Sequence, residues 1–93
     1  MTIFADIEKV IAVARAEIGT AESPAYSNKV KYSDWWGYAG PWCGMYVSWC
    51  FDRAGHPLPK MQDTKRSGFA YCPSAVNWAR RDGSWTDTPK RGD

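Results

Sequence analysis

The chain has 93 residues, of which 44% are hydrophobic and 15% aromatic, and its formal net charge is +2. This length predicts one domain that can bury a core without metals or disulfides, and the apolar content argues against a disordered chain. Basic residues occur in pairs rather than long runs, so we expect no surface for nucleic acid. No apolar stretch approaches the roughly 18 residues of a membrane span, and no signal peptide is recognised. We therefore expect the protein in the cytoplasm of the producing cell, unless a mechanism other than a signal peptide releases it.

The N-terminal segment is predicted to be an amphipathic helix that packs one face on the core. Gly19 is well placed as the residue that ends this helix. The apolar residues that recur at the spacing of one helical face are Ile3, Ile7, Val10, Ile11, Ala14 and Ile18.

Residues 20–41 are predicted to be a long connection that is rich in aromatic side chains. Connections of this length are usually functional or disordered, and the aromatic content argues against disorder. Two interpretations stay open: the rings line an ordered groove, or they cover the core. The aromatic residues are Tyr26, Tyr32, Trp35, Trp36 and Tyr38.

A second helix is expected to start at Pro41 or Trp42 and to end near Ala54. Proline is favoured in a first helical turn, and a helix that is apolar nearly all round is typically buried at the centre of a domain. Gly44 and Ser48 stand four residues apart, which predicts a track of small side chains where another backbone segment can approach.

Residues 55–72 are predicted to be a second long loop because glycine and proline interrupt them. A short third helix follows, with Pro73 at an early position and Gly83 at its end. Residues 84–86 look extended, and residues 88–93 resemble a turn. The sequence thus predicts three helices, long aromatic loops and little strand.

The chain has three cysteines, so any single disulfide leaves one over. One possibility is a bridge between Cys50 and Cys72, and the alternative is that these two are buried free thiols. Cys43 stands at the first turn of the second helix, where unpaired backbone N–H groups favour a thiolate and can stabilise an oxyanion. Gly44 leaves room for a substrate beside the sulfur. Cys50 lies about 10 Å further along the helix, too far for a bridge with Cys43.

The sequence Pro41-Trp42-Cys43-Gly44-Met45-Tyr46-Val47-Ser48-Trp49-Cys50 resembles the nucleophile motif of CHAP domains, which are cysteine- and histidine-dependent amidohydrolases and peptidases. These domains hydrolyse peptidoglycan in bacteriophage lysins and in bacterial wall-remodelling enzymes. Further similar positions precede the motif at Asn28, Lys31-Tyr32 and Trp35-Trp36-Gly37, and follow it at Ala54-Gly55, Cys72, Trp78, Gly83-Ser84-Trp85 and Pro89-Lys90-Arg91-Gly92-Asp93.

The resemblance implies an α+β, papain-like fold. Residues 1–93 would be a single partial domain that contains the helical half and stops before the sheet half. In the family, a strand of the sheet half carries the catalytic histidine. The single histidine of this chain, His56, follows the far end of the second helix, roughly 18–20 Å from Cys43, and is too distant to act as the base.

The resemblance further implies that Cys43 attacks an amide carbonyl of a peptidoglycan peptide. A second segment or chain would supply the histidine, and neither a metal nor another cofactor is required. The residues expected to line the substrate groove are Tyr32, Trp35, Trp36, Tyr38 and Trp42.

Two hypotheses about function follow from the sequence. The chain is an incomplete peptidoglycan amidase or endopeptidase, or it is a non-catalytic fragment that binds the wall or completes a partner. Loss of the sheet half also predicts an exposed apolar patch on the second helix. Activation of Cys43 predicts faster alkylation there than at Cys50 or Cys72.

Overall fold

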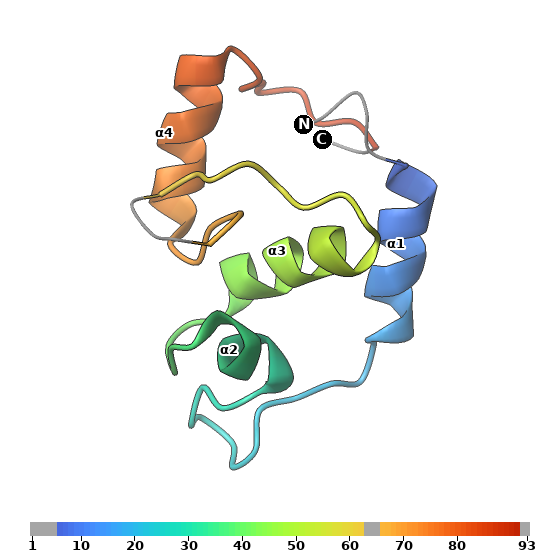
Figure 1. The fold of residues 1–93 in the computed structure, drawn as a ribbon, viewed down its shortest axis with the longest axis vertical. Helices are drawn as coiled ribbons and strands as arrows, with labels where there is room; N and C mark the ends of the chain where they lie inside the picture. The colour runs from blue at the N-terminus through green and yellow to red at the C-terminus, as the bar shows by residue number, and fades with distance from the viewer. Residues whose placement is uncertain (1–5, 63–65, 92–93) are drawn as a thin grey trace.

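The computed structural model describes residues 6–62 and 66–91. Ile3 of the first predicted helix, and Gly92 and Asp93 of the predicted terminal turn, lie outside these ranges. These described residues form four helices, α1 (Ile7–Ala16), α2 (Lys31–Trp36), α3 (Cys43–Arg53) and α4 (Cys72–Asp82). In Figure 1, α3 runs through the middle, with α1 and α4 on opposite sides and α2 below. The described residues contain no β-strand, and their one bridge joins Lys60 and Gly68.

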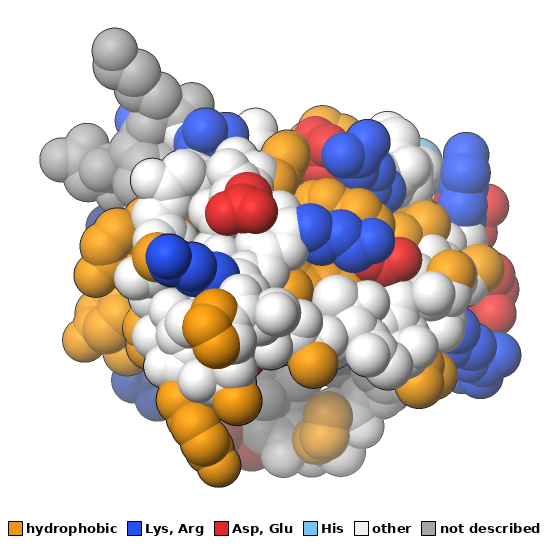
Figure 2. All heavy atoms as spheres, turned by 90° about the horizontal axis from the view of Figure 1, so that it is seen from below, with side chains coloured by type: hydrophobic (Ala, Val, Ile, Leu, Met, Phe, Trp, Pro, Cys, Tyr) orange, Lys and Arg blue, Asp and Glu red, His pale blue; other side chains and the backbone are white. Residues whose placement is uncertain are grey.

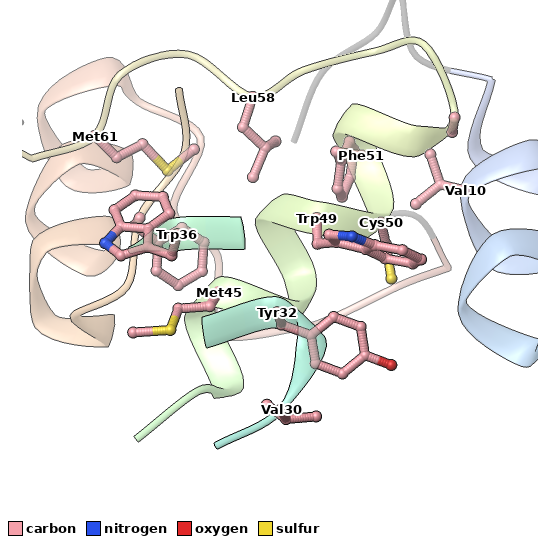
Figure 3. Close-up of a cluster of buried hydrophobic side chains, with 12 residues drawn as sticks. Val10, Val30, Tyr32, Trp36, Met45, Trp49, Cys50, Phe51, Leu58 and Met61 are labelled. Atoms are coloured by element: carbon pink, nitrogen blue, oxygen red, sulfur yellow. The ribbon is translucent and has the colours of Figure 1, made fainter. Parts of the chain in front are cut away.

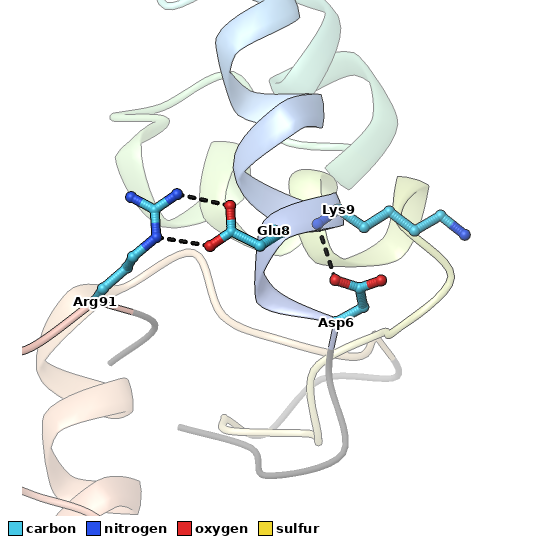
Figure 4. A network of polar contacts seen from close by, with 4 residues as sticks. All are labelled: Asp6, Glu8, Lys9 and Arg91. Carbon is cyan, nitrogen blue, oxygen red and sulfur yellow. Dashed lines mark hydrogen bonds and ion pairs between the residues drawn. The ribbon is translucent and has the colours of Figure 1, made fainter.

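Helix α1 begins as an amphipathic helix should, but it ends earlier than the apolar pattern predicts. The Asp6 side chain caps it by accepting a hydrogen bond from the Lys9 N–H at 3.2 Å, as Figure 4 shows. Glu17 is the C-cap, and Gly19 adopts a left-handed φ of +99° within the turn that follows. Ile18 is therefore not on the buried face and is 83% exposed.

The prediction that residues 20–41 are a connection without a helix is wrong, because α2 lies within them. The described residues therefore form four helices rather than the predicted three. The Ser33 hydroxyl accepts a hydrogen bond from the Val30 N–H, which satisfies a donor at the start of the helix. Gly37 ends the helix in the left-handed conformation, and its N–H donates to the Ser33 carbonyl. A helix of 6 residues lies below the length at which apolar periodicity becomes visible.

The core is built around Tyr32, whose ring stands between α2 and α3 with 1% of the residue exposed (Figure 3). Its centroid lies 4.9 Å from that of Tyr46 and 5.1 Å from that of Trp49, both in edge-to-face geometry. The phenol reaches the edge of the core, where it donates a hydrogen bond to Glu17 at 3.0 Å. Glu17 also pairs with Lys31. The polar tip of Tyr32 is thus satisfied while its ring fills the centre.

Helix α3 is central and largely buried, as predicted, but the expected apolar patch along it is absent from the described structure. Cys43 and Val47 form the exposed part of its apolar surface, and Val47 is 36% exposed. Loop residues supply the cover that the sequence did not predict, namely Leu58, Met61 and Phe69. The buried residues of α3 are Gly44, Met45, Ser48, Trp49, Cys50 and Phe51.

The predicted small-residue track on α3 is confirmed, and residues 68–70 occupy it. A Cβ atom at Gly44 would lie 2.7 Å from the Ala70 carbonyl oxygen, so only glycine allows this approach. The buried Ser48 hydroxyl donates to the Phe69 carbonyl and accepts from the Phe69 N–H, both at 2.9 Å. Gly68 has a left-handed φ of +90° and packs on the same side chain.

Helix α4, like α1, buries a single one of its residues. Pro73 stands in its first turn and Gly83 ends it in the left-handed conformation, both as predicted. Ala79 is its buried residue, whereas Ala75, Val76 and Trp78 are half-buried. A hollow of about 270 Å³ lies between this helix and residues 84–89. The apolar side of α4 thus borders this hollow, which Trp85 and Pro89 also line.

The surface carries charges of both signs. The face in Figure 2 shows Lys and Arg side chains close to Asp and Glu side chains, with hydrophobic groups between them. Near the end of the described chain, Arg91 makes two hydrogen bonds of 2.7 Å to the Glu8 carboxylate on α1 (Figure 4). Among residues 6–62 and 66–91, no helix combines the length and the apolar character needed to cross a bilayer.

Candidate functional site

Cys43 is the first residue of α3 and is exposed. The preceding residue, Trp42, is the N-cap, and its side chain makes no capping hydrogen bond. The first N–H groups of an α-helix have no partner within the helix, and the helix dipole adds positive potential at the same place. The Cys43 sulfur therefore stands where an anion is favoured and where a substrate oxyanion could find backbone donors.

One hollow borders Cys43, and a second hollow lies next to Pro41. One of about 290 Å³ is lined by Asn28, Pro41, Trp42 and Cys43 itself. The other, of about 410 Å³, shares Pro41 with the first. Its remaining lining residues are Trp36, Tyr38, Met45, Gln62, Ala70 and Tyr71. A thiol at the edge of open space is accessible to a ligand from solvent.

The five predicted groove residues do not line one common hollow. Tyr32 belongs to the core and lines neither hollow. Trp36 is 8% exposed but borders the larger hollow together with Tyr38, which is 65% exposed. Trp42 is half-buried and borders the smaller hollow.

Trp35, the fifth predicted residue, is half-buried against its neighbour Trp36, and the guanidinium of Arg66 lies 6.0 Å from its ring centroid. It borders neither hollow. Of the two interpretations of the aromatic segment 20–41, coverage of the core fits Tyr32, while a groove fits Tyr38.

The residue that sequence reasoning missed is Cys72. Its sulfur lies 3.5 Å from the Cys43 sulfur, although the two residues are 29 positions apart. All three cysteines are free thiols, and the suggested bridge between Cys50 and Cys72 is wrong for this structure. Cys50 is 3% exposed in the core, and this burial raises the pKa of its thiol. The sequence did contain a signal for Cys72. Pro73 marks the start of a helix directly at this cysteine, as Pro41 does near Cys43.

Cys72 and Cys43 have different electrostatic surroundings. Partial burial raises the pKa of Cys72, and its contact with the Cys43 sulfur raises that pKa further. Cys72 therefore keeps its proton to higher pH than an ordinary cysteine does. Its S–H is accordingly the donor when Cys43 is a thiolate.

His56 lies at the opposite end of α3 from Cys43. Its N–H donates to the Phe51 carbonyl at 2.9 Å, just beyond the last helical turn. The 11 residues of α3 separate the two ends by about 15 Å at 1.5 Å per residue. A general base must come within about 3 Å of the proton that it accepts, so His56 does not serve Cys43. Within the described ranges, no three His, Cys, Asp or Glu side chains gather into a possible metal site.

No family model matches the chain, and neither a curated protein nor a solved structure matches it. The chemistry of the site therefore rests on its own geometry. That geometry consists of an exposed thiol at a helix start, a second thiol in contact with it, and two hollows that meet at Pro41.

Proposed function

We propose that this chain carries the nucleophile of a cysteine amidase or endopeptidase that hydrolyses peptidoglycan. The observation that carries the proposal is the position of Cys43, which is exposed at the first residue of α3 beside an open hollow. The resemblance of residues 41–50 to the CHAP nucleophile motif supports the substrate class. In this proposal the enzyme acts on the cell wall after release from the producing cell.

The proposed reaction begins when the Cys43 thiolate attacks the carbonyl carbon of an amide in a wall peptide. Backbone N–H groups at the start of α3 stabilise the oxygen as it becomes negative. The C–N bond then breaks, the amine leaves with a proton, and a thioester to Cys43 remains. Water hydrolyses this thioester and regenerates the thiol.

The base in this reaction is a histidine from outside the 93 residues, because His56 lies at the wrong end of α3. A sheet-bearing segment or second chain that completes an α+β, papain-like domain would supply it. Chemistry at the isolated site is then limited to the acylation of Cys43 by activated substrates, since these have leaving groups that need no protonation.

The test is acylation of the 93-residue chain by a p-nitrophenyl ester of a short acyl-peptide, followed by mass spectrometry. We expect an adduct on Cys43, and faster release of nitrophenol when imidazole is added as a base. Cys43→Ala should lose both, whereas Cys50→Ala should keep them because Cys50 is buried. Equal adducts on Cys43 and Cys50, or an unchanged rate in Cys43→Ala, would refute a nucleophilic role for Cys43.

Turbidity clearing of purified walls is the corresponding test on the natural substrate. The chain should clear walls only when a histidine-bearing sheet segment is added, and Cys43→Ala should abolish clearing in the same mixture. Clearing that survives this substitution would assign the activity to the added segment alone.

A second candidate function is wall binding without turnover. The larger hollow favours it, because Tyr38 and Tyr71 stand at its edge and each is 65% exposed. Exposed aromatic rings around a concave surface suit sugars and peptides. Sedimentation with walls should weaken in Tyr38→Ala but not in Tyr26→Ala, which removes a 97% exposed ring that does not line the hollow. Equal binding by both variants would count against this function.

A further inference from the structure

Cys43 and Cys72 form a pair of thiols at the starts of two different helices. Cys43 is the first residue of α3, Cys72 is the first residue of α4, and both are exposed. Their sulfurs are 3.5 Å apart, which is about 1.5 Å more than the length of a disulfide bond. We propose that the two cysteines form a reversible intramolecular disulfide when a hydroperoxide oxidises Cys43, and that this bond masks the Cys43 sulfur.

The contact between the Cys43 and Cys72 sulfurs results from the packing of the backbone segments that carry them, and not from the two side chains alone. Residues 68–70 lie in the track formed by Gly44 and Ser48, and Ser48 holds Phe69 through two hydrogen bonds. The Gln62 side chain accepts hydrogen bonds from the Ala70 N–H at 2.8 Å and from the Tyr71 N–H at 3.1 Å. The segment that leads into Cys72 is thus fixed against the start of α3. The short separation of the sulfurs is a consequence of this packing.

The two sulfurs are suited to different steps. Cys43 borders the hollow of about 290 Å³, which Cys72 does not line, so a small oxidant can reach it. Cys72 keeps its proton, because partial burial and the adjacent sulfur raise its pKa. Cys43 is therefore the thiol that is oxidised first, and Cys72 is the thiol that resolves the oxidised form.

The reaction balances with hydrogen peroxide as the oxidant. The Cys43 thiolate attacks one peroxide oxygen, an S–O bond forms, the O–O bond breaks, and the released hydroxide takes a proton to become water. The Cys72 sulfur then loses its proton and attacks the Cys43 sulfur, so that the S–S bond forms and the S–O bond breaks. The departing hydroxide takes up that proton. Two thiols and one peroxide give one disulfide and two waters, and a dithiol reductant reverses the change by exchange.

The disulfide does not depend on the proposed hydrolase activity. It requires only two thiols that can close and an oxidant that can reach one of them. If Cys43 is also a nucleophile, the oxidised chain cannot be acylated there, and reduction restores the reaction. Formation of the bond is measured by mass and by thiol count, so its failure is distinguishable from a failure of wall hydrolysis.

The experiment treats the 93-residue chain with hydrogen peroxide and compares it before and after dithiothreitol. We expect the mass to fall by two hydrogens, the thiols counted in denaturant to fall from three to one, and both to recover on reduction. Trypsin leaves Cys43 and Cys50 on the same peptide, residues 32–53. Chymotrypsin is therefore used, because it cleaves after Tyr46 and Trp49 and separates them. The linked peptides should contain Cys43 and Cys72.

Matched variants assign the two steps. In Cys72→Ser, dimedone should trap a sulfenic acid on Cys43, because the resolving thiol is gone. In Cys50→Ala, the disulfide should form as in the parent chain. A stable sulfenic acid on Cys43 of the unmutated chain, a link that involves Cys50, or a disulfide-linked dimer on a non-reducing gel would each overturn the proposal.

Discussion

The two sides of α3 differ in how they are covered. On one side, α1 and α2 pack on it and enclose Tyr32 and Trp49. On the other side, residues 68–71 lead into α4 and are held by hydrogen bonds to the side chains of Ser48 and Gln62. The chain thus joins a consolidated three-helix core to a helix held by a few specific contacts. Helix α4 is therefore held by these hydrogen bonds together with the packing of Ala75 and Trp78 on the core, while the three-helix core depends on apolar burial.

The largest expected effect comes from removing a side chain at the centre of the core. Trp49→Ala should lower the free energy of unfolding by about 3–5 kcal/mol, because it deletes a buried ring that packs on Tyr32. Urea unfolding followed by circular dichroism measures this loss. Trp85→Ala, near α4, removes a ring that is 45% exposed and should cost less than about 1 kcal/mol. Equal losses would remove the contrast between the two sides.

A smaller effect is expected from removing the two hydrogen bonds between Ser48 of α3 and Phe69. Ser48→Ala leaves the Phe69 N–H and carbonyl without their buried partner, which should cost about 1–3 kcal/mol. Hydrogen exchange should accelerate at Phe69 and at the start of α4 more than in α1. Ser33→Ala is the control, since it removes a buried hydroxyl at α2 and should not alter exchange at Phe69. Uniform acceleration throughout the chain would show that α4 is not held locally.

The ion pair at the edge of the core should give a pH-dependent effect. A hydrogen bond from Lys31 holds the pKa of Glu17 below its ordinary value of 4.5. A lowered folded-state pKa means that the carboxylate stabilises the fold above pH 4.5, and that this contribution is lost as the pH falls through the folded pKa. The difference in unfolding free energy between the parent chain and Glu17→Gln should thus be largest near neutral pH and vanish in acid. A difference that grows in acid would contradict this assignment.

The smallest effect should come from the contact between Arg91 and α1. The two side chains are 55% and 72% exposed, and exposed ion pairs contribute little because water and salt screen them. Arg91→Ala should leave the urea midpoint at neutral pH within the error of measurement. A clear shift of that midpoint would mean that residues 84–91 hold α4 more firmly than their burial indicates.

The sequence predicted the elements whose signals are local. Apolar spacing located α1, a proline before an almost wholly apolar run located α3, and a proline at one end with a glycine at the other located α4. Helix α2 escaped because six residues are too few to show an apolar periodicity, although Ser33 in its first turn and Gly37 at its end were signals. The placement of Cys43 at the start of α3 could also be predicted from Pro41, and this part of the candidate site is the part that the sequence located.

The contact between the two sulfurs could not be predicted, for a physical reason. It depends on how closely residues 68–70 approach α3, and that approach is decided jointly by Gly44, Ser48 and Gly68. None of these residues, taken within its own segment, indicates that the two segments pack together. Gly44 and Ser48 indicated where a backbone could pack, but nothing in the sequence indicated which backbone it would be.

The position of the two cysteines also has a consequence for chain entropy. A bond between residues 29 positions apart would close a large loop in the unfolded chain, which in the loop-closure account stabilises the folded state by about 3–4 kcal/mol. That is comparable to the loss expected for Trp49→Ala. The closed loop contains the whole connection from α3 to α4, so oxidation would fasten the loosely held helix to the core. Redox conditions would then determine how firmly α4 is attached to the core, as well as whether the Cys43 sulfur is accessible.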